Sequence, residues 1–187
     1  MLTSRAEIPG KTSTRKRGIL SRFRGDRCGA TAIEFGIVAL PFFTLLVALI
    51  EVSLVFFANF TLENAVEKAS RLIRTGQAQT QGFSESQFKQ SICDDVTGIQ
   101  NCLGGLKLDV QRFDDFSGVS LPSPLDANGE LRTDFSYNPG SGGDVVIVRA
   151  FFEWDLIASF PGSLGNMPGG GRLLVATAAF RNEPFDN

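Results

Sequence analysis

Apolar and charged residues are distributed very unevenly along the first third of the chain. No charged residue occurs from Phe35 to Ile50, Glu51 interrupts the apolar run once, and the nine residues that end at Phe60 are again uncharged. A helix over this run is roughly 39 Å long at about 1.5 Å per residue, and the hydrocarbon core of a bilayer is about 30 Å thick. The run therefore predicts one helix that crosses a membrane with some tilt.

The hydrophobic pattern changes after Phe60. Apolar residues now recur at three- and four-residue spacings, with charged or amide side chains between them, at Leu62, Ala65, Val66, Ala69, Leu72 and Ile73. This spacing predicts an amphipathic continuation of the helix, with Gly76 as its stop signal. We expect one helix from about Thr31 to Thr75, whose amphipathic part needs a folded domain to cover its apolar stripe.

Three later segments have the composition of β-strands. Leu106–Phe113 alternates apolar and polar residues, Asp144–Trp154 is β-branched and nearly apolar like a central strand, and Arg172–Phe180 is the third strand. Such strands make a small antiparallel sheet whose apolar face packs on the amphipathic helix. The expected fold class is α+β, with a single-pass N-terminal transmembrane helix that continues into an amphipathic helix packed on the sheet.

The connections carry their own signals. The capping-box pattern Ser84-x-x-Gln87 predicts a short helix to about Ile92. Residues 114–143, rich in Gly, Pro, Ser and Asp, predict a long exposed loop, and residues 161–171 predict a flexible one.

The distribution of charge along the chain predicts the orientation of the helix in the membrane. The chain has a net charge of −2, but residues 1–29 hold eight basic and two acidic residues, a net of +6, so the remainder carries −8. A basic flank marks the cytoplasmic side of a span. We therefore expect a basic cytoplasmic leader (1–29), a transmembrane and amphipathic helix (30–76) and a periplasmic α+β domain (77–187). A basic run could bind nucleic acid, but beside a span it favours anionic lipid head groups, so the predicted partner is membrane lipid and no nucleic acid.

Composition argues against catalysis. The sequence has no histidine, which is the commonest general base and metal ligand, so Ser-His-Asp and Cys-His systems are excluded in their usual form. The acid pairs Asp94-Asp95 and Asp114-Asp115 could serve a hydrolase, but adjacent side chains usually point apart and acids in loops are usually solvated. We predict that the protein is not an enzyme and uses no cofactor and no metal.

Two short motifs imitate binding loops without completing them. Gly10-Lys11-Thr12 is similar to the end of a phosphate-binding loop, but Arg5 stands where that loop needs its first glycine. Asp126–Glu130 is similar to part of a calcium loop, but its glycine is at the fourth position and not the sixth. The second motif instead contains an Asn-Gly turn signal.

The three cysteines fall on two sides of the span. Cys28 lies on the basic side, whereas Cys93 and Cys102 lie beyond the span, where an oxidising periplasm permits a disulfide. Closing this short loop would stabilise the domain by roughly 2–3 kcal/mol. Two free buried thiols are the alternative, and we favour the disulfide.

The start of the apolar run resembles a class III signal, in which a basic leader is cut after a glycine and the fifth mature residue is a glutamate. Counted from Ala30, Glu34 is the fifth residue. The passage from Arg27 to Phe42 resembles the TadE-like family, pseudopilin-type proteins of the tight-adherence (Flp, type IVc) pilus machinery. The resemblance extends through Glu51 and residues 61–76, and the ending at 178–185 is similar too.

This resemblance implies a pilin-like fold and a cut between Gly29 and Ala30 by an inner-membrane prepilin peptidase. It implies assembly or recognition roles for Glu34, Phe35 and Glu51, other pilins, pseudopilins and the inner-membrane pilus machinery as partners, and a part in adhesion and biofilm formation. The expected location is the bacterial inner membrane.

The residues themselves support a role for Glu34. Cleavage would leave an ammonium at Ala30, which is unfavourable at the positive end of a helix dipole, and Glu34 lies one turn away at i+4. Pairing the two charges between neighbouring subunits in lipid would fix their register. Ala32 and Gly36 form a small-xxx-small pair that lets another helix approach. A carboxylate at head-group level without contacts is the alternative for Glu34, and for Glu51 an interfacial position is at least as well supported.

The sequence thus predicts a non-catalytic pseudopilin-like subunit or assembly factor. The alternative is a membrane-anchored periplasmic binding module unrelated to pili.

Overall fold

The structure, a computed structural model, describes residues 29–157 and 164–185 of the 187-residue chain. Residues 1–28 of the predicted leader, with the phosphate-loop-like motif and Cys28, and part of the predicted loop at 161–171 lie outside these residues. The chain divides into two compact units between Leu45 and Leu46, inside the first helix, and each unit is described by itself.

One long helix, α2, runs from Gly29 to Arg74 and passes through Pro41 without ending. It is long and apolar enough to cross a membrane. In the first unit its large apolar side chains are exposed, as the 70% exposure of Phe35 and the 55% exposure of Phe43 illustrate. The Thr44 hydroxyl donates to the Leu40 carbonyl (2.8 Å), so this polar group is satisfied within the helix itself. The helix begins two residues before the predicted Thr31.

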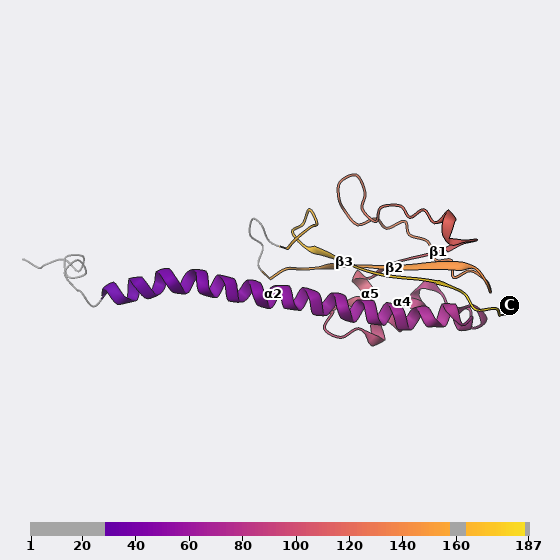
Figure 1. Ribbon diagram of the computed structural model, residues 1–187, viewed down its shortest axis with the longest axis horizontal. Coiled ribbons are helices and arrows are strands. Elements are labelled where there is room, and N and C mark those ends of the chain that lie inside the picture. The colour runs from indigo at the N-terminus through magenta and orange to yellow at the C-terminus, as the bar shows by residue number, and fades with distance from the viewer. Residues whose placement is uncertain (1–28, 158–163, 186–187) are drawn as a thin grey trace, which may run out of the picture. The chain divides into compact units, whose positions relative to one another are not determined.

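The second unit is an α+β domain, as predicted (Figure 1). After α2 come the short helix α3 (Gln77–Thr80), α4 (Glu85–Asp95), α5 (Cys102–Gly105), strand β1 (Lys107–Phe113), the 3-10 turn η1 (Phe116–Gly118), and strands β2 (Val145–Trp154) and β3 (Arg172–Arg181). The three strands form one antiparallel sheet in the order β1-β2-β3. The nearly apolar strand is therefore the central one, as its composition predicted.

One face of the sheet packs against the amphipathic part of α2. Alternate residues of β2, from Val146 to Phe152, join a core cluster with α2 residues spaced as in the sequence pattern. The α2 members of that cluster are Val55, Ala58, Leu62, Ala65, Val66, Ala69 and Ile73. Buried residues at this helical spacing thus begin before Phe60, inside the uncharged run, where no polar residues separate them in the sequence. The core of the domain begins at Val55.

Helix α4 covers the same face of the sheet. Its predicted capping box is present, because the Ser84 hydroxyl accepts from the Gln87 N–H (3.3 Å) and the Gln87 side chain accepts from the Ser84 N–H (2.9 Å). Phe88 and Ile92 are fully buried in the core cluster. The helix ends at Asp95, three residues later than predicted.

The segment 114–143 is a long and mostly exposed loop, as predicted, but it also covers the other face of the sheet, which the sequence did not predict. Leu125, Leu131 and Phe135 from this segment pack against a second cluster of Phe151, Met167 and Leu173, and the Phe135 and Phe151 rings stack with centroids 5.1 Å apart. Figure 1 shows this segment on the opposite side of the sheet from α2. Isolated apolar residues in a polar segment give no periodic signal, so the sequence pattern missed this layer.

Candidate processing and assembly segment

The predicted cleavage residues Gly29 and Ala30 are the first two residues of α2. The first N–H groups of a helix have no intrahelical partner, so this turn is the easiest part of the helix to open. A Cβ atom added to Gly29 would meet nothing within 4 Å. No packing within the described residues therefore requires a glycine here.

Glu34 is exposed on α2, one turn beyond Ala30. Over the described ranges, no hydrogen bond or ion pair reaches its carboxylate. Its neighbours Ile33 and Phe35 are 67% and 70% exposed. The carboxylate therefore lies on an apolar helical surface without an intramolecular partner among the described residues.

The predicted small-residue pair, Ala32 and Gly36, is exposed on the same helical segment. As at Gly29, a Cβ added to Gly36 would meet nothing within 4 Å. No packing within the described chain therefore needs glycine at this position, whereas close approach by a second helix would.

Glu51 has the opposite environment and belongs to the other compact unit. Its residue is 3% exposed, and its Oε1 accepts a hydrogen bond from the Ile157 N–H at 2.6 Å. The structure thus supplies the partner that the sequence could not: a backbone group just beyond the end of β2. An assembly role for Glu51, like those of Glu34 and Phe35, stays a prediction.

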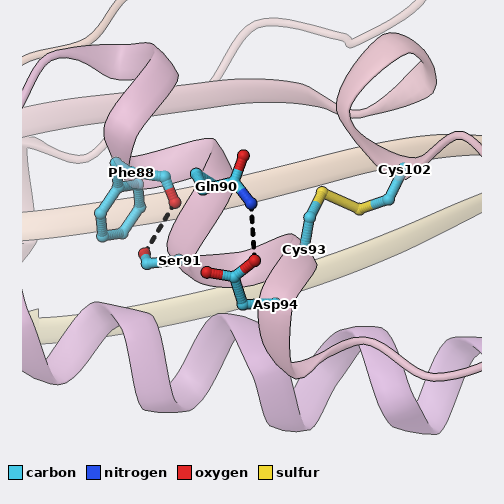
Figure 2. Close-up of a disulfide and its surroundings, with 6 residues drawn as sticks. All are labelled: Phe88, Gln90, Ser91, Cys93, Asp94 and Cys102. Carbon is cyan, nitrogen blue, oxygen red and sulfur yellow. Dashed lines mark hydrogen bonds between the residues drawn. A yellow bond between two sulfur atoms is a disulfide. The ribbon is translucent and has the colours of Figure 1, made fainter.

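Cys93 and Cys102 form a disulfide between α4 and α5, with Cα atoms 5.7 Å apart. Figure 2 shows the bridge at the C-terminal end of α4, beside the hydrogen bond from the Gln90 amide to Asp94 (2.6 Å). The loop that it closes contacts α2, because Lys68 forms an ion pair with Asp95 at 3.0 Å. The disulfide therefore belongs to the scaffold of the domain and not to the segment around Gly29.

Sequence reasoning missed a buried ion pair on the outer face of the sheet. Asp109 of β1 lies directly opposite Arg149 of β2, with side chains 2% and 8% exposed, and the Arg149 Nε donates to Asp109 at 3.1 Å. Burial acts to raise the pKa of Asp109, but hydrogen bonds from Gln111, Arg149 and Ser136 outweigh it and hold this pKa below its usual value. Arg149 also donates to the Pro122 carbonyl (2.9 Å), which ties the covering segment to the sheet.

The acidic residues considered for a hydrolase do not converge. Asp94 and Asp95 bind Gln90 and Lys68 respectively. Among residues 29–157 and 164–185, no group of three or more His, Cys, Asp or Glu side chains could hold a metal ion. The Asp126 carboxylate accepts from the Asn128 and Glu130 N–H groups, and so caps a turn of its own loop.

Comparison with curated proteins and with solved structures gave no match. The family model of TadE-like proteins matches residues 29–71. The matched segment begins at the glycine of the predicted cleavage site and ends three residues before the end of α2. It contains Gly29, Ala30, Glu34, Phe35 and Glu51, so over residues 29–71 the chain is similar to TadE-like proteins, and the resemblance seen in the sequence is confirmed for this segment.

Proposed function

We propose that the protein is a non-catalytic pseudopilin-like subunit or assembly factor of a tight-adherence (Flp, type IVc) pilus. In this proposal α2 anchors it in the bacterial inner membrane, with the leader in the cytoplasm and the α+β domain in the periplasm. A prepilin peptidase removes the leader between Gly29 and Ala30.

The observation that carries the proposal is the TadE-like match over residues 29–71, which supports participation in a tight-adherence pilus system. The match covers the long apolar helix and begins at the glycine after which the peptidase would cut. Near its start, Ile33, Glu34 and Phe35 have side chains that are exposed in the described fold.

The two glycines give independent support. Neither Gly29 nor Gly36 is needed for packing, because an added Cβ would meet nothing within 4 Å at either position. Gly36, which lies inside α2, also weakens the helix relative to alanine. A peptidase cleft could approach Gly29 closely, and a neighbouring helix could approach Gly36 closely, only because glycine has no side chain.

Glu34 has a physical role in such an assembly. In lipid a lone carboxylate is costly, so it favours a partner of opposite charge. The ammonium that cleavage creates at Ala30 is such a partner, either in the same chain or in a neighbouring subunit. Pairing between subunits would set the axial register of two α2 helices.

The experiment compares Glu34→Ala with Glu67→Ala in a bacterium that has a tight-adherence pilus system but lacks its own copy of this protein. Glu67 is a matched control because it is an exposed glutamate on the same helix. We expect both variants to insert in the inner membrane, and only Glu34→Ala to lose piliation. Normal piliation with Glu34→Ala would contradict the assembly role and favour a binding module unrelated to pili.

A further inference from the structure

We propose that Leu156 and Ile157, which follow β2, lie in the membrane leaflet on the side of the folded domain, with Ile157 against lipid acyl chains and Glu51 accepting a hydrogen bond from its backbone N–H. The domain would then contact the bilayer through a second element besides α2. This inference rests on the proposed membrane anchoring by α2.

The first observation is the unusual burial of Glu51. Large apolar side chains around it on α2 are exposed: Ile50 by 51%, Leu54 by 37% and Phe56 by 71%. Glu51 itself is 3% exposed, and the Ile157 N–H donates to its carboxylate at 2.6 Å. The carboxylate is therefore covered by the domain, as Val55 is, whereas the side chains of Ile50, Leu54 and Phe56 remain exposed.

The second observation is the depth of this contact. Glu51 follows Glu34 by seventeen positions, which corresponds to about 26 Å of helix, less than the roughly 30 Å of hydrocarbon. Exposed apolar side chains continue beyond it through Phe57 and Phe60. If α2 spans the bilayer, the hydrogen bond between Glu51 and Ile157 lies within or at the edge of the hydrocarbon.

In lipid this hydrogen bond stabilises both the Ile157 N–H and the Glu51 carboxylate. A backbone N–H without a partner is costly in hydrocarbon, and so is a carboxylate exposed to acyl chains. The contact removes both costs together. It leaves the Ile157 side chain, 72% exposed, as the outward surface of the segment.

In this proposal, residues typical of the membrane–water interface lie farther from the bilayer centre than Ile157. Trp154, the only tryptophan of the chain, pairs with Arg172 across β2 and β3. Arg172 lines a groove together with Asn59 of α2, and Asp155 is exposed. Trp and Arg are favoured at head-group level. Three residues reach at most about 10 Å, so Trp154 at the interface places Ile157 no deeper than the upper acyl chains.

The test measures depth by fluorescence quenching of the full chain in vesicles of phosphatidylglycerol and brominated phosphatidylcholine, with bromine near either end of the acyl chain. In a Trp154→Phe background, single tryptophans are placed as Ile157→Trp, Phe43→Trp and Thr177→Trp. Phe43 lies in the apolar run, and Thr177 is exposed on β3, about 17 Å along the strand from Arg172. Resistance of the Cys93–Cys102 disulfide to a thiol reductant, measured by alkylation of the thiols released, checks that each variant is folded.

We expect Ile157→Trp to lose fluorescence to bromine near the carbonyl end of the acyl chain, Phe43→Trp to lose it to the deeper bromine, and Thr177→Trp to keep its fluorescence. Native Trp154 should be quenched less than Ile157→Trp. Quenching of Phe43→Trp without quenching of Ile157→Trp would overturn this inference and leave the anchoring intact. No quenching of Phe43→Trp would overturn the anchoring itself, and the inference with it.

Discussion

Asp109 and Arg149 face each other across β1 and β2 as a buried ion pair, and the pair holds the segment 121–137 against the outer face of the sheet. Ser136 donates to Asp109 (3.3 Å) from the covering segment, and Arg149 donates to the Pro122 carbonyl of the same segment (2.9 Å). The Arg149 guanidinium also lies 5.4 Å from the centre of the Phe151 ring. Two charges in an otherwise apolar layer thus connect three pieces of chain.

Removing one member of this pair should be strongly destabilising. Arg149→Met leaves the Asp109 carboxylate buried without its partner, and we expect a loss of about 3–5 kcal/mol in the free energy of unfolding. The measurement is urea unfolding of the full chain in detergent, followed by Trp154 fluorescence. Arg132→Met is the matched control, because its ion pair with Asp134 (2.6 Å) is exposed to solvent and screened by it, and we expect a much smaller loss than for Arg149→Met. Equal losses for the two variants would contradict the structural role of the buried pair.

Acid should weaken the fold through Asp109. Its pKa in the folded state lies below the ordinary value of 3.8, so near that pH the folded state binds fewer protons than the unfolded state. The contribution to stability is therefore complete above the unfolded pKa and is lost as pH falls through the folded pKa. We expect Asp109→Asn to show a smaller decrease in urea midpoint than the parent when pH is lowered through 3.8. An equal decrease in the urea midpoints of both proteins would show that groups other than Asp109 cause the acid sensitivity.

The disulfide should account for a measurable part of the stability. In the Cys93→Ser, Cys102→Ser double variant we expect a loss of about 2–3 kcal/mol, because the bridge closes a short loop in the unfolded chain. A thiol reductant should lower the urea midpoint of the parent to that of the double variant and leave the double variant unchanged. A parent chain unaffected by reductant would show that the two thiols are free.

Tyr137 provides a direct spectroscopic check, because it is the only tyrosine of the chain. Its hydroxyl is buried without a hydrogen-bond partner among the described residues, and its ring lies 5.9 Å from that of Phe88. Burial, with a smaller effect of Glu85, raises the pKa of Tyr137 to about 12. Absorbance titration should give that midpoint for the folded chain and one near 10.0 in urea.

Tyr137→Phe should keep or increase stability, since it removes an unpaired polar group, and a clear loss of stability would contradict this environment.

The sequence predicted the elements that carry a periodic signal. Helix α2 followed from an uncharged run joined to a 3.6-residue pattern, and β2 was predicted to be central because its segment is β-branched and nearly apolar. The covering layer on the outer face could not be predicted, because Leu125, Leu131 and Phe135 are single apolar residues in a polar segment. Arg149 gave no sign of its partner either, since its contact with Asp109 depends on the register of β1 and β2.

In the candidate site, too, the sequence indicated the residues with a local pattern but not the contact between distant residues. Gly29, Ala30 and Glu34 could be predicted because their spacing is local and resembles a known signal. The partner of Glu51 could not, because Ile157 is 106 residues away along the chain. Contacts of this kind arise only once the sheet has placed the end of β2 against α2.

The most direct test of the proposed function is the N-terminal residue of the protein extracted from membranes of cells with an active prepilin peptidase. Intact mass and N-terminal sequencing should show a parent chain that begins at Ala30, and a Gly29→Ala variant that keeps its leader. An added Cβ at Gly29 meets nothing within 4 Å, so this variant should fold and insert normally, and its retained leader would report on the peptidase alone. A parent chain that keeps residues 1–29 in such cells would contradict the proposal.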